Sequence, residues 1–243
     1  MSPRPETPAP AEGLGIHRLV VGYAGSPVCA PVSVDVAPGE AVCLVGANGA
    51  GKSTVLKAVA GLLTPLDGTV RWRGQALDER TSAYRRDVAT VLDEDAWFPE
   101  LSVAEHLELV ARGHGVRDVV DVVDAELERQ ALTEQADQLP TALSSGQRRR
   151  LLLAAALVRP RALLLLDEPE QRLDPTGREA LAERLAAERD AGTALLLATH
   201  DTVLLRRVAD RAVVVVDAGG AEDCPVVDPG EAARIVTAPV AQG

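Results

Sequence analysis

The most restrictive feature of the chain is the stretch GANGAGKST at residues 46–54, which follows directly after the apolar run AVCLV at residues 41–45. The stretch fits the pattern G-x-x-x-x-G-K-[ST], whose fixed positions are Gly46, Gly51, Lys52 and Ser53. Glycines let backbone N–H groups approach a phosphate without a Cβ in the way. A helix that begins there directs its positive end at the anion. The sequence therefore predicts a strand, a tight phosphate-binding loop and a helix in direct succession.

The side chains of this loop suit a nucleoside triphosphate with its metal. Lys52 neutralises charge on the β- and γ-phosphates, the hydroxyl of Ser53 is a ligand for Mg²⁺, and Thr54 reaches the α-phosphate. The alternative is a glycine-rich turn that matches by chance, and the strand-then-helix context argues against it. We expect nucleotide contacts from the whole loop: Gly46, Ala47, Asn48, Gly49, Ala50, Gly51, Lys52, Ser53 and Thr54.

Strand-like runs alternate with helical patterns on both sides of a helical middle stretch. The runs IHRLVVGY, PVSVDV, AVCLV, TVRWRG and VATVL come first, and ALLLLD, TALLLAT and AVVVVD come last. Between about residues 93 and 158, SVAEHLELVARG and VRDVVDVVDAELERQAL show helical apolar spacing instead. This order predicts an α/β fold in which helices cover both faces of a mostly parallel sheet, with a helical lobe inserted at about 93–158.

Composition limits the partners and the compartment. The chain has 243 residues, enough for one domain with a sizeable core, and a net charge of −11. A nucleic-acid binder normally has a basic surface, so nucleic acid is not expected as a partner. Three cysteines without a C-x-x-C pair make a zinc site or a disulfide framework improbable and fit a reducing cytosol.

The apolar runs are too short to span a membrane, since a spanning helix needs roughly 18 apolar residues or more. The first residues, MSPRPETPAPAEG, have no apolar signal-peptide region and favour a disordered tail. We therefore expect a tail at residues 1–13 and a single domain at residues 14–243.

The run ALLLLDEP ends in two carboxylates, Asp167 and Glu168. A buried strand that ends in Asp167 can present this carboxylate to Mg²⁺. Glu168, one residue further on, can orient or deprotonate a water at the γ-phosphate. An ordinary turn at a strand end is the alternative, and the phosphate loop elsewhere in the chain argues against it.

A second stretch, LSSGQRRR at residues 143–150, opens a predicted helix that runs to Val158. It resembles the signature motif of the ATP-binding cassette (ABC) ATPases, usually written LSGGQ. In that family the motif binds the γ-phosphate of a nucleotide held by a second subunit. The resemblance implies nucleotide contacts from Ser144, Ser145, Gly146 and Gln147, although Ser145 stands where glycine is commoner. A capped helix is the alternative, but it leaves the RRR run unexplained because basic residues at a helix start oppose the dipole.

The resemblance covers about residues 15–217 and implies further site residues. Tyr23 lies where the family has an aromatic ring that stacks on adenine. Asp174, in QRLDP, lies in the loop that links the two nucleotide sites, and His200, in LLLATHD, matches the switch histidine at the γ-phosphate. Asp93 replaces the glutamine that the family has at the junction into the helical lobe, and we expect it near the metal. Glu94 could take this place if the alignment is shifted by one residue, or the acidic run could be a solvated loop.

The resemblance implies a P-loop NTPase core with a mostly parallel sheet, an N-terminal antiparallel β portion and an inserted α-helical lobe. It implies the ATP-hydrolysing subunit of an ABC transporter, with ATP and Mg²⁺ as cofactors. The implied partners are a second ABC ATPase subunit, identical or not, and separate polytopic membrane subunits. The implied location is cytoplasmic, on the inner face of the cell membrane.

Three alternatives to the export of a substrate stay open. We expect export over import because no regulatory domain follows the last strand. A soluble ABC ATPase without a transport role is disfavoured, because the segment between Gly46 and Leu143 has no coiled-coil heptads and the chain has one cassette without zinc-binding cysteines. A cassette that binds ATP without hydrolysing it is disfavoured because both Glu168 and His200 are present.

Overall fold

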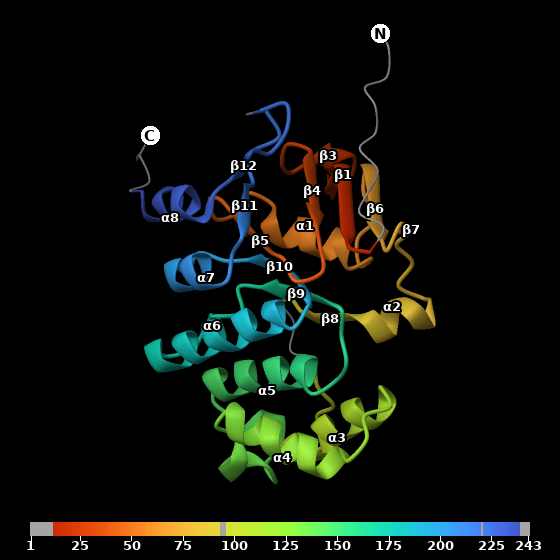
Figure 1. Cartoon of the computed structure of the whole chain (residues 1–243), viewed down its shortest axis with the longest axis vertical. Coiled ribbons are helices and arrows are strands. Elements are labelled where there is room, and N and C mark those ends of the chain that lie inside the picture. The colour runs from red at the N-terminus through yellow and green to blue at the C-terminus, as the bar shows by residue number, and fades with distance from the viewer. Residues whose placement is uncertain (1–11, 93–95, 220, 239–243) are drawn as a thin grey trace.

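The computed structural model describes residues 12–92, 96–219 and 221–238. Figure 1 shows the described strands in the upper and middle parts of the view and most of the helices below and beside them. The strands are β1 (Leu14–Val20), β2 (Gly22–Tyr23), β3 (Ser26–Pro27), β4 (Val32–Val36), β5 (Ala41–Val45), β6 (Asp67–Trp72), β7 (Gln75–Ala76), β8 (Val88–Val91), β9 (Leu163–Asp167), β10 (Ala194–Ala198), β11 (Arg211–Val214) and β12 (Val226–Val227). The helices are α1 (Lys52–Val59), α2 (Ser82–Asp87), α3 (Val103–Gly113), α4 (Val119–Arg129), α5 (Ser145–Leu157), α6 (Pro175–Asp190), α7 (Thr202–Arg207) and α8 (Pro229–Thr237), with 3-10 turns η1 (Thr133–Gln135) and η2 (Pro140–Ala142).

The central sheet has the order β12-β11-β5-β10-β9-β8. Its neighbouring strands are parallel except for the edge pair β11 and β12. In β9, Leu163 and Leu165 face one apolar cluster, and Leu164 and Leu166 face another on the opposite side. This period of two, with every residue buried, is typical of a parallel strand covered on both faces. The predicted mostly parallel sheet is confirmed.

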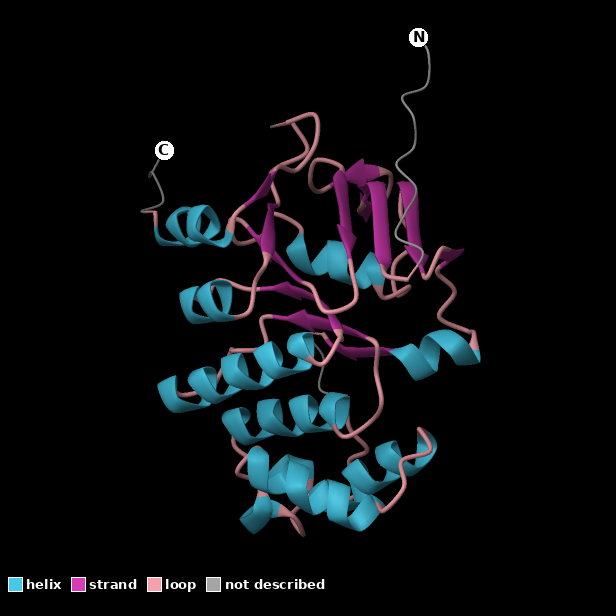
Figure 2. Cartoon of the chain, in the orientation of Figure 1, coloured by secondary structure: helices cyan, strands magenta, loops and turns pink. Residues whose placement is uncertain are grey.

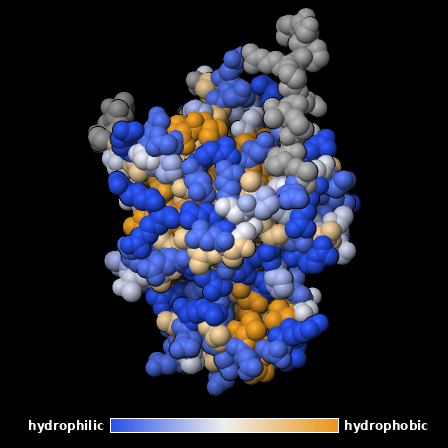
Figure 3. All heavy atoms as spheres, in the orientation of Figure 1, coloured by the Kyte–Doolittle hydropathy of each residue, from blue (hydrophilic) through white to orange (hydrophobic). Residues whose placement is uncertain are grey.

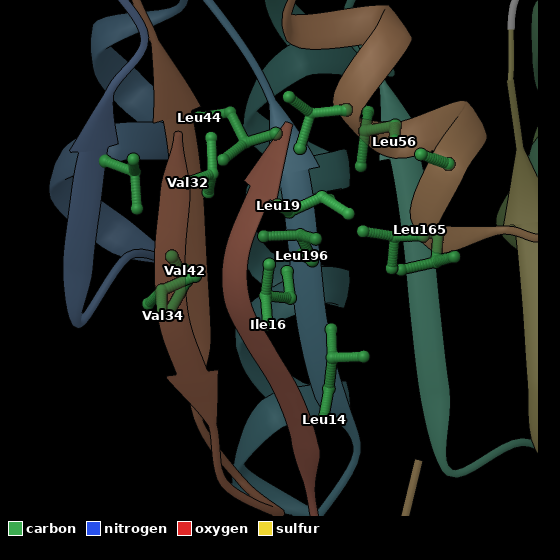
Figure 4. Packing of buried hydrophobic residues seen from close by; sticks show 14 of the residues in the cluster. Leu14, Ile16, Leu19, Val32, Val34, Val42, Leu44, Leu56, Leu165 and Leu196 are labelled. Carbon is green, nitrogen blue, oxygen red and sulfur yellow. The ribbon is translucent and has the colours of Figure 1, made fainter. Parts of the chain in front are cut away.

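A second sheet, with the order β4-β1-β6-β7, is antiparallel and packs over one face of the central sheet. Figure 4 shows the apolar layer between them, where Leu14, Ile16 and Leu19 of β1 point towards residues of the central strands. Leu56 of α1 belongs to the same cluster, so the helix after the phosphate loop is held between the two sheets. The predicted N-terminal antiparallel portion is therefore confirmed.

The opposite face of the central sheet is covered by helices α5 to α8 (Figure 2). Helix α5 is apolar on two sides. Leu153 and Leu157 pack towards the sheet, whereas Leu151 and Ala154 pack with α3 and α4 in a third cluster. Because α5 packs against the sheet on one side and against α3 and α4 on the other, it joins the inserted helical lobe to the sheet.

The helical lobe begins where the sequence predicts a helix start. Ser102 caps α3 and forms a reciprocal capping box with Glu105. Residues 93–95, at the predicted start of the lobe, lie outside the described residues, as do residues 1–11 of the predicted tail. The structure adds short elements that the sequence pattern does not predict, namely α2, α8, β3, β7 and β12. It also divides the predicted run IHRLVVGY between β1 and β2.

The face of the molecule in Figure 3 is mostly hydrophilic, with a hydrophobic patch over its lower part, where α3 and α4 lie. Leu109 of α3 and Val120 of α4 are among the exposed large apolar side chains. No helix in the described ranges combines the length and the apolar character needed to cross a bilayer.

Candidate functional site

The phosphate loop lies between β5, which ends at Val45, and α1, which begins at Lys52. The backbone of the loop requires glycine at two of its fixed positions. A Cβ on Gly46 would lie 2.4 Å from the carbonyl oxygen of Val215, and Gly51 caps α1 with a φ of 101°. L-residues with a side chain rarely adopt that conformation. The predicted strand, loop and helix are therefore present, with N–H groups of the first helical turn directed at the loop.

Lys52 folds back over this loop. Its ammonium donates hydrogen bonds to the carbonyl oxygens of Gly46 and Ala47, at 3.0 and 2.9 Å, and the residue is buried. Burial lowers the pKa of Lys52, while the carboxylates of Glu168 and Asp167 oppose this effect. The cation is thus held at the loop by neutral acceptors, and an anionic phosphate is a stronger partner for it.

Two adjoining cavities bring the phosphate loop and the carboxylates of β9 together. The larger one, of about 370 Å³, lies along the loop and is lined by Asn48, Gly49, Gly51, Lys52, Ser53, Thr54, Glu168 and Gln171. The smaller one, of about 190 Å³, extends from Ser53 to the end of β9 and is lined by Ser53, Arg149, Leu152, Asp167, Glu168, Gln171 and Arg172. The structure therefore brings together two motifs that the whole helical lobe separates in the sequence.

Ser53 and Asp167 form the side of this site that suits a metal. They line the same cavity and offer a hydroxyl and a carboxylate, which are hard oxygen donors. Mg²⁺ is commonly bound by one or two such groups, with phosphate oxygens and waters as its other ligands. In the described part of the chain no group of three or more His, Cys, Asp or Glu residues could hold a metal without such additional ligands. Asp93, expected near the metal, and its alternative Glu94 lie outside the described residues.

Glu168 and His200 meet at the edge of the cavity. Nε2 of His200 lies 3.4 Å from Oε1 of Glu168, and the Gln171 amide donates a hydrogen bond to Oε2 of Glu168. Glu168 has a φ of 43°, a left-handed conformation that costs about 1–3 kcal/mol in a residue with a side chain. Burial and the charge of Lys52 lower the pKa of His200, against the opposing effect of Glu168. The Glu168 carboxylate, which is carried on a strained backbone, and the His200 imidazole therefore lie on the same side of the phosphate loop.

Three residues of this site are absent from the predicted set. Gln171 contacts Glu168, and buried Glu170 accepts hydrogen bonds from the Thr199 hydroxyl and the His200 N–H. Arg149 is buried against the end of β9. The sequence offers a signal for Arg149 alone, namely the RRR run that helix capping leaves unexplained. Glu170 has no such signal, because its contacts with Thr199 and His200 exist only when the ends of β9 and β10 lie side by side. Gln171 contacts Glu168 within the turn after β9, and no motif of the sequence marks it.

The signature stretch is the start of α5. Ser144 caps this helix, its hydroxyl accepts from the Gln147 N–H at 3.3 Å, and the Gln147 amide oxygen accepts from the Ser144 N–H at 2.8 Å. Capping, the alternative to nucleotide binding, is thus present in the structure. It still leaves backbone N–H groups of the first turn, at Ser145 and Gly146, without acceptors inside the helix. None of these four residues is among the lining residues of the two cavities beside the phosphate loop.

Tyr23 and Asp174 are also not among the lining residues of these two cavities. Tyr23 is on the β2–β3 hairpin and is 55% exposed. Asp174 caps α6 by accepting from the Gly177 N–H at 2.9 Å, and Arg150 donates to it at 3.3 Å. The exposed ring of Tyr23 is accessible for stacking on a base. The exposed side chain of Asp174, next to the start of α5, is accessible to a second molecule.

Comparison with known proteins gives consistent relatives. The family model described as ABC transporter matches residues 29–171. A sulfate/thiosulfate import ATP-binding protein, CysA 2 of Chromobacterium violaceum, is 35% identical over 87% of this chain and 58% of its own length. A Nod factor export ATP-binding protein I of Cupriavidus metallidurans is 37% identical over 77% of this chain and 62% of its own length. The chain therefore spans about three fifths of these two relatives.

Two further matches cover more of the related protein. The SkfA peptide export ATP-binding protein SkfE of Bacillus subtilis is 34% identical over 76% of this chain and 78% of its own length. A solved structure of the ATP binding subunit of an ABC transporter superposes with a TM-score of 0.81 at 28% identity, covering 93% of this chain and 95% of that one.

Proposed function

Because this chain belongs to the ABC transporter family, as an ATP-binding subunit, we propose that it hydrolyses ATP with Mg²⁺ and so powers transport through separate membrane subunits. One observation carries the proposal. The phosphate loop with Lys52, the possible metal ligands Ser53 and Asp167, and the carboxylate of Glu168 all border one pair of adjoining cavities. These are the parts that phosphoryl transfer needs, since its catalysis consists mainly of positioning and charge stabilisation.

The residues have distinct roles in the proposed reaction. The loop N–H groups and Lys52 bind the β- and γ-phosphates, and Ser53 and Asp167 hold Mg²⁺, which neutralises phosphate charge when bound. Glu168 orients the attacking water and accepts its proton, while the bond between the γ-phosphorus and the β–γ bridging oxygen breaks. His200 contacts the γ-phosphate from the side of Glu168. Tyr23 stacks on the adenine.

Lys52→Ala tests the hydrolytic part of the proposal. The change removes a buried cation from the phosphate loop, so ATP turnover should be lost and the affinity for a fluorescent ATP analogue should fall. Lys57→Ala is the matched control, because Lys57 is a lysine of the last turn of the same helix. A Lys52→Ala protein with the turnover and affinity of the wild type would refute the phosphate-loop function.

The partners follow from the incomplete site of one chain. We infer that a second ABC ATPase subunit contributes its signature stretch (Ser144, Ser145, Gly146 and Gln147) and Asp174 to the nucleotide, because none of these lines the cavities of its own chain. The membrane subunits would be separate polytopic proteins, with this chain bound to them on the cytoplasmic face. A tagged form of the wild-type chain should then co-purify with a polytopic protein from detergent extracts of its host. Recovery without any membrane protein would count against the transport role.

Export is the direction that we propose. The Nod factor and SkfA peptide relatives are named as export proteins, whereas the sulfate/thiosulfate relative is named as an import protein and supports the importer alternative. The polytopic protein recovered with the chain identifies the transporter on which the two directions can be compared. Uptake or efflux of its substrate in cells with and without this chain gives the direction.

A further inference from the structure

The basic run at the start of α5 has partners outside its helix. Arg148 lies over the Trp97 ring, 6.0 Å from its centroid, and Arg150 donates to Asp174 at 3.3 Å. Arg149 is buried, with 8% of its surface exposed. These three arginines are the fourth to sixth residues of α5, and a cation near a helix N-terminus gains nothing from the helix dipole. Contacts outside the helix therefore have to favour these positions, and Arg149 has the most specific set of contacts.

The guanidinium of Arg149 binds three successive carbonyl groups at the end of β9. Nη2 donates to the carbonyl oxygen of Asp167 and, at 2.6 Å, to that of Glu168. Nε donates to the carbonyl oxygen of Pro169 at 3.2 Å. A planar guanidinium presents several N–H groups in a fixed geometry, which a lysine ammonium cannot reproduce.

Two of these carbonyls determine the backbone conformation of Glu168. The carbonyl of Asp167 belongs to the peptide plane before the Glu168 Cα, and the carbonyl of Glu168 belongs to the plane after it. The rotations of these two planes about the bonds to Cα are φ and ψ. A single nitrogen that binds both oxygens therefore restrains both angles. Glu168 has a φ of 43°, which a residue with a side chain adopts only when its surroundings hold it there. On the other side, its N–H donates to the Ala198 carbonyl oxygen at 2.9 Å.

We propose that Arg149 is a positioning residue that holds the backbone of Glu168 in its left-handed conformation and so links the start of the signature helix to the hydrolysis site of the same chain. The proposal rests on the proposed ATPase function and deepens it. Arg149 does not have to touch ATP. Its effect on the reaction passes through the direction of the Glu168 carboxylate.

Other contacts support a link between this helix and the segment after β9. A Cβ on Gly146 would lie 2.9 Å from the carbonyl oxygen of Arg172, so the first turn of α5 packs directly on this segment. Arg150 and Asp174 add an ion pair between the same two parts. These contacts connect the start of α5, where a nucleotide of a second subunit would bind, to the segment that includes Glu168.

The test compares Arg149 with a matched arginine elsewhere. Arg159 also binds three backbone carbonyls, those of Arg85, Arg86 and Val88, at 2.6, 3.2 and 3.0 Å, but at the opposite end of the central sheet from Glu168. Arg149→Met should lower kcat on the order of 10²-fold with little change in the KM for ATP, because a misplacement of about 1 Å has this effect. Arg149→Lys should recover part of the rate. Arg159→Met should retain the kcat of the wild type.

A second measurement reports on Glu168 without turnover. The chain has four histidines, and the ring signals of labelled histidine can be followed individually by NMR. His200 lies 3.4 Å from Glu168, so Arg149→Met should shift the His200 signal and leave that of His114 in place. Burial and, to a smaller extent, the charge of Arg159 lower the pKa of His114. Arg159→Met should therefore shift the His114 signal and leave that of His200 in place.

The outcomes separate this proposal from the proposed function. Wild-type turnover no higher than that of Lys52→Ala would overturn the ATPase function, and the histidine signals would still decide the role of Arg149. An active wild type with equal kcat values for Arg149→Met and Arg159→Met, or an unshifted His200 signal in Arg149→Met, would overturn the positioning role alone. If Arg149→Met does not fold, the same comparison is made between Arg149→Lys and Arg159→Lys.

Discussion

The side chain of Glu170 fixes the positions of Thr199 and His200 by hydrogen bonds. Its Oε1 accepts from the Thr199 hydroxyl at 2.6 Å and from the His200 N–H at 3.2 Å. Burial raises the pKa of Glu170, against the opposing effect of these hydrogen bonds. The backbone position of His200 therefore depends on a side chain at the end of the neighbouring strand.

Replacing Glu170 should alter turnover more than ATP binding. Glu170→Ala removes the acceptor that holds His200, so kcat should fall by up to about 10²-fold while the KM for ATP changes little. Glu170→Gln keeps a side-chain oxygen at this place and should remain close to the wild type. Steady-state ATPase assays measure both constants.

The control for this prediction is another buried glutamate. Glu126 of α4 is 1% exposed and pairs with Arg129 of the same helix and with Arg184 of α6. It does not line either cavity beside the phosphate loop. Glu126→Gln should leave kcat unchanged. If Glu170→Ala keeps the wild-type kcat, His200 is positioned by other contacts.

At the scale of elements, the sequence predicts those helices and strands that bury apolar residues with a clear period. The strands β5 and β10 are apolar throughout, and β9 is apolar up to Asp167. Helices α3, α5 and α6 begin at a serine or aspartate that caps them. Helix α2 has six residues and buries one apolar side chain, Tyr84, so its pattern carries little signal. In α8 the buried residues are only Ala232 and Ala233.

The site residues follow the same division. The glycines of the phosphate loop, Lys52, Asp167 and Glu168 belong to stretches whose spacing has a local physical reason. Arg149 and Glu170 act on backbone groups of other elements, and those groups come within reach only after the sheet and α5 have packed. Side-chain contacts between elements are therefore the part of the site that sequence spacing alone does not predict.

Helix α3 contains a histidine whose burial makes the lobe sensitive to acid. His106 is 3% exposed, and its ring lies 5.8 Å from that of Phe98. Neither ring nitrogen has a hydrogen-bond partner among the described residues. Burial lowers the pKa of His106. The folded chain therefore takes up a proton at this site only at a lower pH than the unfolded chain.

This difference should weaken the fold as the pH falls below about 6.5, where an unfolded histidine becomes protonated. His114 and His200 act in the same direction, because their pKa values are also lowered. His106→Leu removes one contribution, so the free energy of unfolding of this variant should depend less steeply on pH below about 6.5. Urea unfolding of both proteins at several pH values measures the slopes. Equal slopes would contradict a neutral buried His106.

At the scale of the whole molecule, the layered fold separates the phosphate loop from the signature stretch. The loop follows the end of β5 and leads into α1, whereas Ser144 begins the helix that joins the sheet to the helical lobe. Under the proposed function, one chain therefore presents two halves of a nucleotide site on different parts of its surface. A second subunit with the same two parts can complete both sites, which is a closed two-fold arrangement.

Glu168→Gln should trap this dimer. Loss of a positioned base slows hydrolysis by about 10²–10⁴-fold, so ATP stays bound and both signature stretches stay engaged. Gel filtration with ATP and Mg²⁺ should show a dimer for Glu168→Gln and a monomer without nucleotide. A monomer under both conditions would contradict a homodimer of this chain.

The position of the interface is tested by adding charge to the signature stretch in the Glu168→Gln background. Ser145 is exposed in the first turn of α5, where an aspartate is favourable for the helix itself. Ser145→Asp should therefore leave the subunit folded, while its carboxylate repels the γ-phosphate bound to the other subunit. Ser145→Asn has nearly the same shape without the charge. With ATP we expect a dimer for the asparagine variant and a monomer for the aspartate variant. High salt should weaken the difference if the aspartate remains partly exposed, because salt screens the repulsion. Dimers of equal stability in both variants would place the interface away from α5.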